Sequence, residues 1–307
     1  MILLVTGAWN CTQEQLKHLE GLGNQVFFLQ NEKDALPLAY EDVEGVICNG
    51  LFLHHPIEKF VNLKYIQLTS AGFDRVLMAY VQEHSIAINN ARGVYSIPMA
   101  EFALSSVLSV YKETRFFRQA QAECVWKKHR GLRELAGKRI CIVGCGSVGS
   151  ECALRFTAMG CHVVGIDAFP MQRAGYHAIL PVKALKDIAA KSDIMILTLP
   201  LTQETYRIID ADVLNALAEG AVIVNISRGA IVDTEALITC LSGRPDLTAI
   251  LDVFEQEPLP ADSRLWTMDN VWITPHNSFV GEGNTARLQT VIFDNLRSFT
   301  ADSSEIF

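Results

Sequence analysis

Short apolar runs alternate with longer amphipathic stretches along almost the whole chain. This alternation is typical of parallel β-strands covered by helices, and it predicts an α/β fold. In the first hundred residues, strands are expected at residues 2–6, 25–29, 45–48, 65–68 and 86–88. Helices are expected between some of these strands, at residues 12–23 and 74–84.

A second series of short apolar runs begins near residue 139. Strands are expected there at residues 139–144, 162–167, 194–199, 221–226, 248–251 and 271–274. Two series of alternating strands and helices predict two α/β units.

Two helical patterns have no strand of their own and are expected to link the units. The first, at residues 98–118, has Pro98 where a first helical turn tolerates proline, and it looks like the crossing between the units. The second, at residues 285–302, is expected to return to the first unit. We therefore expect a discontinuous first domain, 1–98 plus 282–307, and a second domain at 99–281.

The composition favours a small-molecule partner. The chain of 307 residues is 50% hydrophobic and has a formal net charge of -8. It has no basic stripe that could neutralise phosphates, which argues against nucleic acid or an anionic membrane as a partner.

The cysteines and the N-terminus favour a cytoplasmic protein. The eight cysteines include no C-x-x-C pair, and several lie in apolar runs, so reduced and buried thiols are expected. The start, MILLVTGAWN, lacks a basic segment and is interpreted as a strand rather than a signal peptide. No apolar run reaches the roughly 18 residues of a membrane helix. No metal site is expected, because His54 and His55 have no third ligand at metal spacing.

The strongest local motif is 144-GCGSVG-149, which directly follows one expected strand and precedes a helix. Its glycines permit a tight turn, close approach of the backbone to a pyrophosphate, and close packing of the helix. Asp167 ends the next strand, 18 residues after Gly149, where a carboxylate can bind the adenosine ribose. This carboxylate also repels a 2′-phosphate, which favours NAD over NADP. The alternative is a chance glycine turn beside a carboxylate that only caps a strand.

Three ionisable residues follow three further strands of the same series. Arg228 lies in 225-NISRGAIVD-233, Glu257 follows 252-DVFEQ-256, and His276 lies just after the last expected strand. A partly buried guanidinium needs an anionic partner, which is either a structural carboxylate or a bound anion. Alone, each residue is explained by a structural ion pair or a loop histidine. Together, at strand ends of one sheet, they indicate a site for a carboxylate substrate.

Taken in order, these segments resemble the D-isomer-specific 2-hydroxyacid dehydrogenases. The resemblance rests on GCGSVG, Asp167, 198-TLPLTQETYRIID-210, NISRGAIVD, DVFEQEP and 274-TPH-276, and more thinly on 69-TSAGFD-74 and 90-NARGVYSIPMAEFAL-104. It implies two flavodoxin- or Rossmann-like, doubly wound domains with the active site in the cleft between them. The first domain would bind the substrate and the second would bind NAD.

The resemblance also implies a role for individual residues. Arg228 would grip the substrate carboxylate, His276 would donate and accept the proton, and Glu257 would orient the imidazole. Asp252 would hold the nicotinamide carboxamide. The substrate residues implied are Leu51, Ala71, Gly72, Arg228 and His276. The cofactor residues implied are Gly144, Gly146, Ser147, Val148, Gly149, Asp167, Leu199, Pro200, Thr205, Ile226, Ser227, Arg228, Asp252 and His276.

Some positions depart from the family pattern. Thr198 stands where many members have histidine, and Asn277 stands where a small or apolar residue is more usual. The pocket loop 48-CNGLFLHHP-56 has no arginine or lysine, which weakens the case for a phosphorylated substrate. Trp126 lies in the segment where relatives make dimer contacts, so a homodimer is expected.

The sequence therefore predicts an NAD-dependent dehydrogenase that interconverts a small 2-keto acid, of the glyoxylate, hydroxypyruvate or pyruvate type, and its D-2-hydroxy acid. Two kinds of alternative stay open. One is an NAD-sensing, corepressor-like regulatory protein. The other is a dehydrogenase that acts on a bulkier keto acid or uses NADP.

Overall fold

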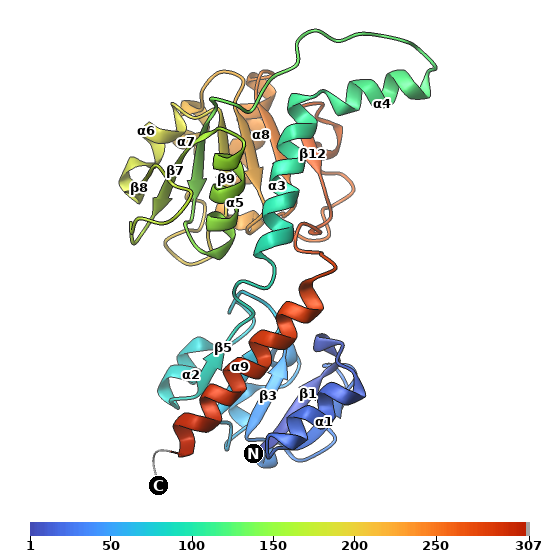
Figure 1. The fold of residues 1–307 in the computed structure, drawn as a ribbon, viewed down its shortest axis with the longest axis vertical. Helices are drawn as coiled ribbons and strands as arrows, with labels where there is room; N and C mark the ends of the chain where they lie inside the picture. The colour runs from blue at the N-terminus through green and yellow to red at the C-terminus, as the bar shows by residue number, and fades with distance from the viewer. Residues whose placement is uncertain (305–307) are drawn as a thin grey trace. The chain divides into compact units, whose positions relative to one another are not determined.

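In the computed structural model, which describes residues 1–304 and their side chains as far as Ala301, the chain forms two compact units (Figure 1). Unit 1 comprises Met1–Tyr95 and the C-terminal segment that begins at Gly281, and unit 2 comprises Ser96–Val280. The expected domain boundaries lie within three residues of these divisions. Each unit contains one parallel β-sheet with helices, which confirms the two-unit α/β class.

Unit 1 is built on a five-stranded sheet in the order β2-β1-β3-β4-β5. Its strands are β1 (Ile2–Thr6), β2 (Gln25–Leu29), β3 (Gly45–Cys48), β4 (Tyr65–Leu68) and β5 (Ala87–Asn89). Its helices are α1 (Gln13–Gly21), α2 (Met78–Glu83) and α9 (Asn284–Ser304). The strand order reverses between β1 and β3, as in flavodoxin-like sheets.

Successive residues of each strand in unit 1 enter different cores on the two faces of the sheet, as a two-residue period requires. Leu4 and Ile66 pack with Val81 of α2 on one face. Leu3 packs on the other face with α1 and with Ile292 of α9. The final helix therefore completes the core of unit 1 (Figure 1).

Unit 2 is built on a seven-stranded sheet in the order β12-β11-β10-β9-β6-β7-β8. Its strands are β6 (Arg139–Val143), β7 (His162–Asp167), β8 (Ala178–Pro181), β9 (Ile194–Leu197), β10 (Val222–Asn225), β11 (Thr248–Leu251) and β12 (Val271–Ile273). One face packs against α3 (Ser96–Tyr111) and α5 (Ser147–Ala158). The other face packs against α6 (Leu185–Ala189), α7 (Ala211–Ala216) and α8 (Thr234–Gly243).

Two elements differ from the sequence prediction. Strand β8 was not expected, because it has four residues, is only partly buried and ends in Pro181, which suits the edge of a sheet. The single helix expected at residues 98–118 is divided into α3 and α4 (Thr114–Ala122). Glu113 adopts a left-handed conformation with φ 52° between them, which ends α3 although the helical pattern continues.

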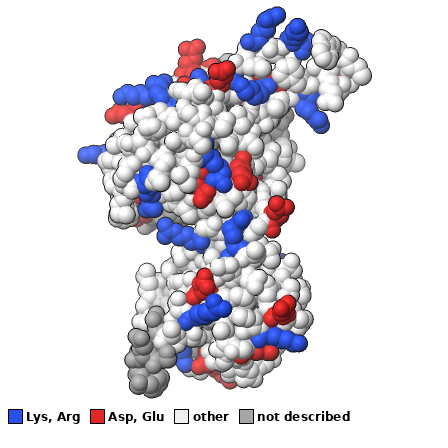
Figure 2. All heavy atoms as spheres, in the orientation of Figure 1, with Lys and Arg blue, Asp and Glu red and all other residues white. Residues whose placement is uncertain are grey.

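The structure contains no helix, among those it describes, that is long and apolar enough to cross a membrane. Figure 2 shows acidic and basic side chains mixed over the visible face of each unit. Six of the eight cysteines are buried, and all eight are free thiols.

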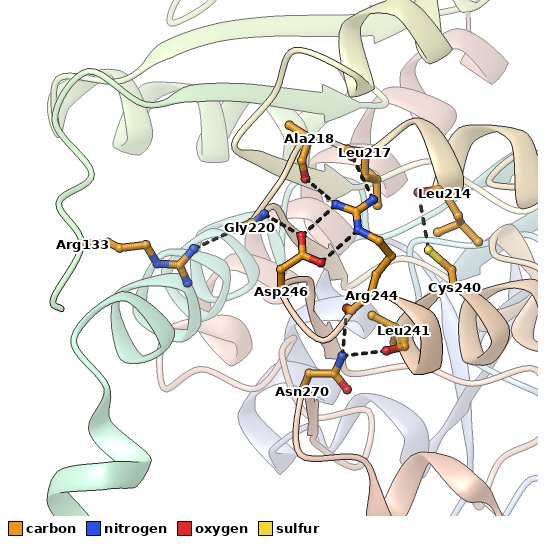
Figure 3. A network of polar contacts seen from close by, with 10 residues as sticks. All are labelled: Arg133, Leu214, Leu217, Ala218, Gly220, Cys240, Leu241, Arg244, Asp246 and Asn270. Carbon is orange, nitrogen blue, oxygen red and sulfur yellow. Dashed lines mark hydrogen bonds and ion pairs between the residues drawn. The ribbon is translucent and has the colours of Figure 1, made fainter.

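A polar network joins the loops at the amino edge of the unit 2 sheet (Figure 3). The Arg244 guanidinium donates to both oxygens of Asp246, at 2.9 and 2.8 Å, and to the carbonyls of Leu217 and Ala218. Asp246 also accepts the Gly220 N–H at 2.9 Å. The hydrogen bond from Arg244, followed by that from Gly220, lowers the pKa of Asp246 from 3.8 to about 2.

We expect Asp246→Asn to lower the melting temperature above pH 5, and this deficit to shrink as the pH falls from about 4 toward 2. The folded-state pKa of Asp246 lies below its unfolded value, so the stabilisation is present above the unfolded pKa and is lost as Asp246 becomes protonated. Thermal melts of the wild type and the variant from pH 2 to pH 7 measure the deficit. Asp212→Asn is the control, because Asp212 makes an exposed pair with Lys186. A deficit independent of pH would show that the charge of Asp246 is not what stabilises the loops.

Candidate active site

The carboxyl edge of the unit 2 sheet brings most of the predicted site residues together. The glycine loop follows β6, and Asp167 is the last residue of β7. Arg228, Asp252 and His276 lie in the segments after β10, β11 and β12, which are adjacent strands. Open parallel sheets bind their ligands at this edge.

The glycine loop leads directly into α5, whose first turn has no side-chain cap. Its early backbone N–H groups are therefore available to an anion, and the helix dipole favours a phosphate there. A Cβ on Gly149 would lie only 2.1 Å from the Gly144 carbonyl oxygen, so glycine is required for this close packing. Thr198, the departure from the family histidine, donates its hydroxyl to the same carbonyl oxygen at 2.6 Å. Thr198 thus stabilises the loop, which the sequence alone did not reveal.

Asp167 bonds to the glycine loop and to the segment that follows its own strand, β7. Its Oδ2 accepts the Cys145 N–H at 2.7 Å and its Oδ1 accepts the Phe169 N–H at 2.9 Å. Each carboxylate oxygen has lone pairs left for a further donor. The carboxylate therefore fixes the loop and can still accept a hydrogen bond from a ribose hydroxyl.

The loop that carries Arg228 is held by its own polar side chains. Asn225 donates through Nδ2 to the Arg228 carbonyl at 3.0 Å and accepts the Ser227 hydroxyl at 2.8 Å. A Cβ on Gly229 would lie 1.8 Å from the Phe254 carbonyl carbon, so only glycine lets the loops after β10 and β11 approach this closely. Arg228 is half-buried, and its Nη1 donates to the Ser227 carbonyl at 2.8 Å.

His276 and Glu257 form a hydrogen-bonded pair, with 2.7 Å between Nδ1 and Oε2. The other carboxylate oxygen of Glu257 accepts the Phe254 N–H at 3.0 Å. The side chain of His276 is 37% exposed, and that of Glu257 is 35% exposed. A carboxylate can only accept, so Nδ1 carries a proton and Nε2 is the nitrogen that can gain or lose one. No hydrogen bond among the described residues uses Nε2. The arrangement is therefore that of an oriented general acid and base.

Asp252 holds the turn that presents His276. Its carboxylate is 0% exposed and accepts the Thr274 hydroxyl at 2.6 Å, the Asn277 N–H at 2.8 Å and the Ser278 N–H at 2.9 Å. These bonds support the left-handed backbone of His276, where φ is 50°. The sequence did not reveal this role. The contact of Asp252 with a carboxamide stays a prediction.

The other predicted cofactor residues have mainly local partners. Thr205 donates its hydroxyl to the Pro200 carbonyl at 2.7 Å, and Leu199 packs against the core. Ile226 is buried in the core, so only its backbone is placed to meet a ligand. No group of three or more His, Cys, Asp or Glu side chains in the described part of the chain could hold a metal ion.

In unit 1, the predicted substrate residues differ in whether a ligand could reach them. The Ala71 carbonyl accepts a hydrogen bond from Asn90 at 2.6 Å, and the Gly72 carbonyl accepts one from Ser70 at 3.1 Å. No hydrogen bond between described residues uses the N–H group of Ala71 or Gly72, so both can serve an anion. Leu51, by contrast, is 0% exposed within the core of unit 1. The expectation that its side chain contacts the substrate is therefore corrected. The side chain of Leu51 packs into the core of unit 1 and holds the loop against that core.

Comparison with known proteins identifies the family. The model of the "D-isomer specific 2-hydroxyacid dehydrogenase, NAD binding domain" matches residues 104–278. A glyoxylate reductase of Thermofilum pendens is 33% identical over 223 residues, which span 70% of this chain and 65% of that protein.

Solved structures extend the similarity to both units. A D-isomer-specific 2-hydroxyacid dehydrogenase family protein of Aeromonas salmonicida matches with a TM-score of 0.84 at 28% identity, covering 98% of this chain and 96% of that one. A D-isomer-specific 2-hydroxyacid dehydrogenase of Xanthobacter autotrophicus, in complex with NADPH and MES, matches with a TM-score of 0.79 at 31% identity, covering 98% and 95%. The family match covers more than half of the chain and includes the glycine loop, Arg228 and His276. The chain belongs to the D-isomer-specific 2-hydroxyacid dehydrogenases, a family of oxidoreductases.

Proposed function

We propose that the protein is an NAD-dependent D-2-hydroxyacid dehydrogenase that interconverts a small 2-keto acid and its D-2-hydroxy acid. The observation that carries this proposal is the pair of His276 and Glu257, which leaves Nε2 of His276 as the proton-transferring atom. The pair lies at the same sheet edge as an uncapped helix N-terminus suited to a pyrophosphate. General acid–base chemistry and a dinucleotide site on one edge fit a dehydrogenase.

The residues at this edge fit a bound nicotinamide dinucleotide. The N–H groups at the start of α5 would hold the pyrophosphate, and Asp167 would bind the adenosine ribose. The dinucleotide, when bound, supplies a hydride to the keto carbon or accepts it from the hydroxy acid. The contacts proposed for Leu199, Pro200, Thr205, Ser227 and Asp252 stay predictions.

The protein itself would bind the substrate and move the proton. The Arg228 guanidinium would grip the carboxylate through two parallel hydrogen bonds and polarise the keto oxygen. The unused N–H groups of Ala71 and Gly72 would complete the carboxylate cradle. In reduction, Nε2 of His276 would donate its proton to the keto oxygen, which becomes the hydroxyl, and Glu257 would stabilise the imidazolium before that step.

The direct test is oxidation of NADH in the presence of glyoxylate, hydroxypyruvate, pyruvate, 2-ketoisocaproate or phenylpyruvate. We expect the highest kcat/KM with one of the first three. A preference for either of the last two would indicate a pocket for a bulkier keto acid. Tight binding of NADH without turnover of any of them would favour the corepressor-like regulatory protein instead.

The preference for NAD over NADP is tested at Asp167. We expect Asp167→Ala to weaken NADH more than NADPH and to change the ratio of the two dissociation constants by about tenfold. The variant loses a ribose acceptor and also a charge that repels a 2′-phosphate. Fluorescence titration of the free protein with each cofactor measures the ratio. An equal loss of affinity for both cofactors would show that Asp167 only bonds to Cys145 and Phe169 and does not select the cofactor. The comparison of the two cofactors is needed because the similar Xanthobacter protein was solved with NADPH.

We also propose that the protein is a cytoplasmic homodimer. The segment after α4 exposes Trp126 at 96%, together with Val125 at 48% and Leu132 at 41%. In Figure 1 this segment projects from the rest of unit 2. Exposed apolar side chains of this size mark association surfaces, and a second copy of the chain is the proposed partner. Sedimentation of the wild type and of Trp126→Ala tests this proposal.

A further inference from the structure

The carboxyl edge of the unit 1 sheet has its reversal of strand order between β1 and β3. In open α/β sheets, ligands usually bind at this point. Here the position is taken by a side chain of the protein itself, Glu32, which follows β2 by three residues.

The Glu32 carboxylate has three hydrogen-bond donors around it. Its Oε1 accepts the Thr6 hydroxyl and the Asn49 N–H, each at 2.7 Å. Its Oε2 accepts the Gly50 N–H, also at 2.7 Å. Thr6 is the last residue of β1, and Asn49 and Gly50 directly follow β3. The carboxylate thus connects the two strands between which the order reverses.

The backbone of Glu32 holds the far end of the same loop. Its carbonyl oxygen lies 2.9 Å from Nε2 of His55, whose Nδ1 lies 2.8 Å from the Tyr40 hydroxyl. A carbonyl only accepts, so Nε2 of His55 carries the proton and Nδ1 accepts from Tyr40. His55 is buried, and Leu51 between the two ends is buried as well. Glu32 therefore holds both ends of the segment 49–55 by hydrogen bonds.

We propose that Glu32 is a positioning residue for the substrate loop. Its carboxylate fills an anion cradle, formed by the Thr6 hydroxyl and two consecutive backbone N–H groups, and thereby fixes residues 49–55. The importance of this loop for the substrate rests on the proposed function and on the family resemblance, from which residues 48–56 are expected to shape the substrate pocket.

The charge of the carboxylate is essential to this arrangement. Successive N–H groups that converge on one point form an anion-binding concavity, and bonds from them to an ionised acceptor are stronger than neutral ones. An amide in place of the carboxylate would turn an N–H donor toward other donors.

The experiment compares Glu32→Ala, Glu32→Gln and the wild type, each with and without added formate. Removal of the carboxylate leaves three donors unpaired, so we expect Glu32→Ala to raise the KM for the keto acid by about tenfold, with kcat changed by less than about threefold. The dissociation constant of NADH, whose proposed site lies in unit 2, is expected to stay the same. Glu58→Ala is the matched control, because this carboxylate is exposed and no hydrogen bond or ion pair of a described residue involves its side chain.

Chemical rescue distinguishes a positioning carboxylate from a merely structural one. Formate fits the space left by the side chain in Glu32→Ala, so it should restore the KM of this variant. It should not restore Glu32→Gln, where the amide fills the space. Hydrogen exchange of the Asn49 and Gly50 amides gives a readout that does not depend on turnover. We expect exchange about tenfold faster in Glu32→Ala, and slowed again by formate.

Several results would overturn the proposal: an unchanged KM in Glu32→Ala, a loss of kcat and NADH binding along with KM, or amide exchange that formate does not slow. Failure of the proposed function has a different signature, because the wild type itself would then turn over no keto acid. In that case the exchange measurement still decides whether Glu32 fills the cradle.

Discussion

Replacement of Arg228 by glutamine should lower kcat/KM for keto-acid reduction by about three orders of magnitude, the equivalent of about 4 kcal/mol. Glutamine is neutral and shorter, and it cannot form two parallel charged hydrogen bonds to a carboxylate. The affinity for NADH and the melting temperature should change little, because the loop is held by Asn225 and by the approach of Gly229 to Phe254. Steady-state kinetics, fluorescence titration and thermal melts measure the three quantities.

Arg207→Gln is the matched control for this prediction. Arg207 also lies in unit 2 but pairs with Glu255 at 3.1 Å and with Asp233 at 3.6 Å, so its role is structural. Its replacement should leave kcat/KM nearly unchanged. The opposite result would be a lower melting temperature in Arg228→Gln with normal turnover by the folded fraction. Arg228 would then be a structural arginine, and the proposed carboxylate site would be wrong.

Replacement of Glu257 by glutamine should lower kcat/KM by about tenfold in both reaction directions. The carboxylate of Glu257 accepts from Nδ1 of His276 at 2.7 Å, which leaves Nε2 as the nitrogen that transfers the proton. A glutamine amide can donate to Nδ1 as well as accept from it, so it no longer fixes which ring nitrogen carries the proton. Reduction and oxidation use the same proton transfer in opposite directions, so both should lose rate.

The measurement is kcat/KM in both directions, with deuterated NADH to confirm that hydride transfer limits the rate of reduction. Glu255→Gln serves as the control, because this carboxylate belongs to the same loop but bonds to Arg207 and Thr234. Its kcat/KM should match that of the wild type. An unchanged kcat/KM in Glu257→Gln would show that Glu257 does not orient His276.

Much of the candidate site followed from the sequence because strands that alternate with helices predict a parallel sheet. A parallel sheet places the carboxyl ends of all its strands at one edge, so residues that follow β6, β7, β10, β11 and β12 had to meet there. The spacing of the glycine loop and of Asp167 depends on one strand, one helix and the next strand. The pair of His276 and Glu257 was expected from the resemblance, and the structure places these two side chains in contact.

Other features depend on contacts between residues far apart in the sequence. The sequence did not indicate that the carboxylate of Asp252 bonds to Thr274, Asn277 and Ser278, because only the register of β11 and β12 brings these groups together. Leu51 was expected to contact the substrate, but the core of unit 1 buries it. The sequence of a loop does not show which of its apolar side chains will pack into the core and which will face a ligand.

What the sequence by itself determined is the class of fold, most of the strands and the family, because these depend on periodicity and on motifs with fixed spacing. The tertiary structure alone decided which polar groups find partners. The helical pattern after Tyr111 shows no interruption, and only the left-handed Glu113 separates α3 from α4. Likewise, Glu32 is one acidic residue among many in the sequence, and it becomes a loop anchor only because β1 and β3 are neighbours in the sheet and present three donors to it.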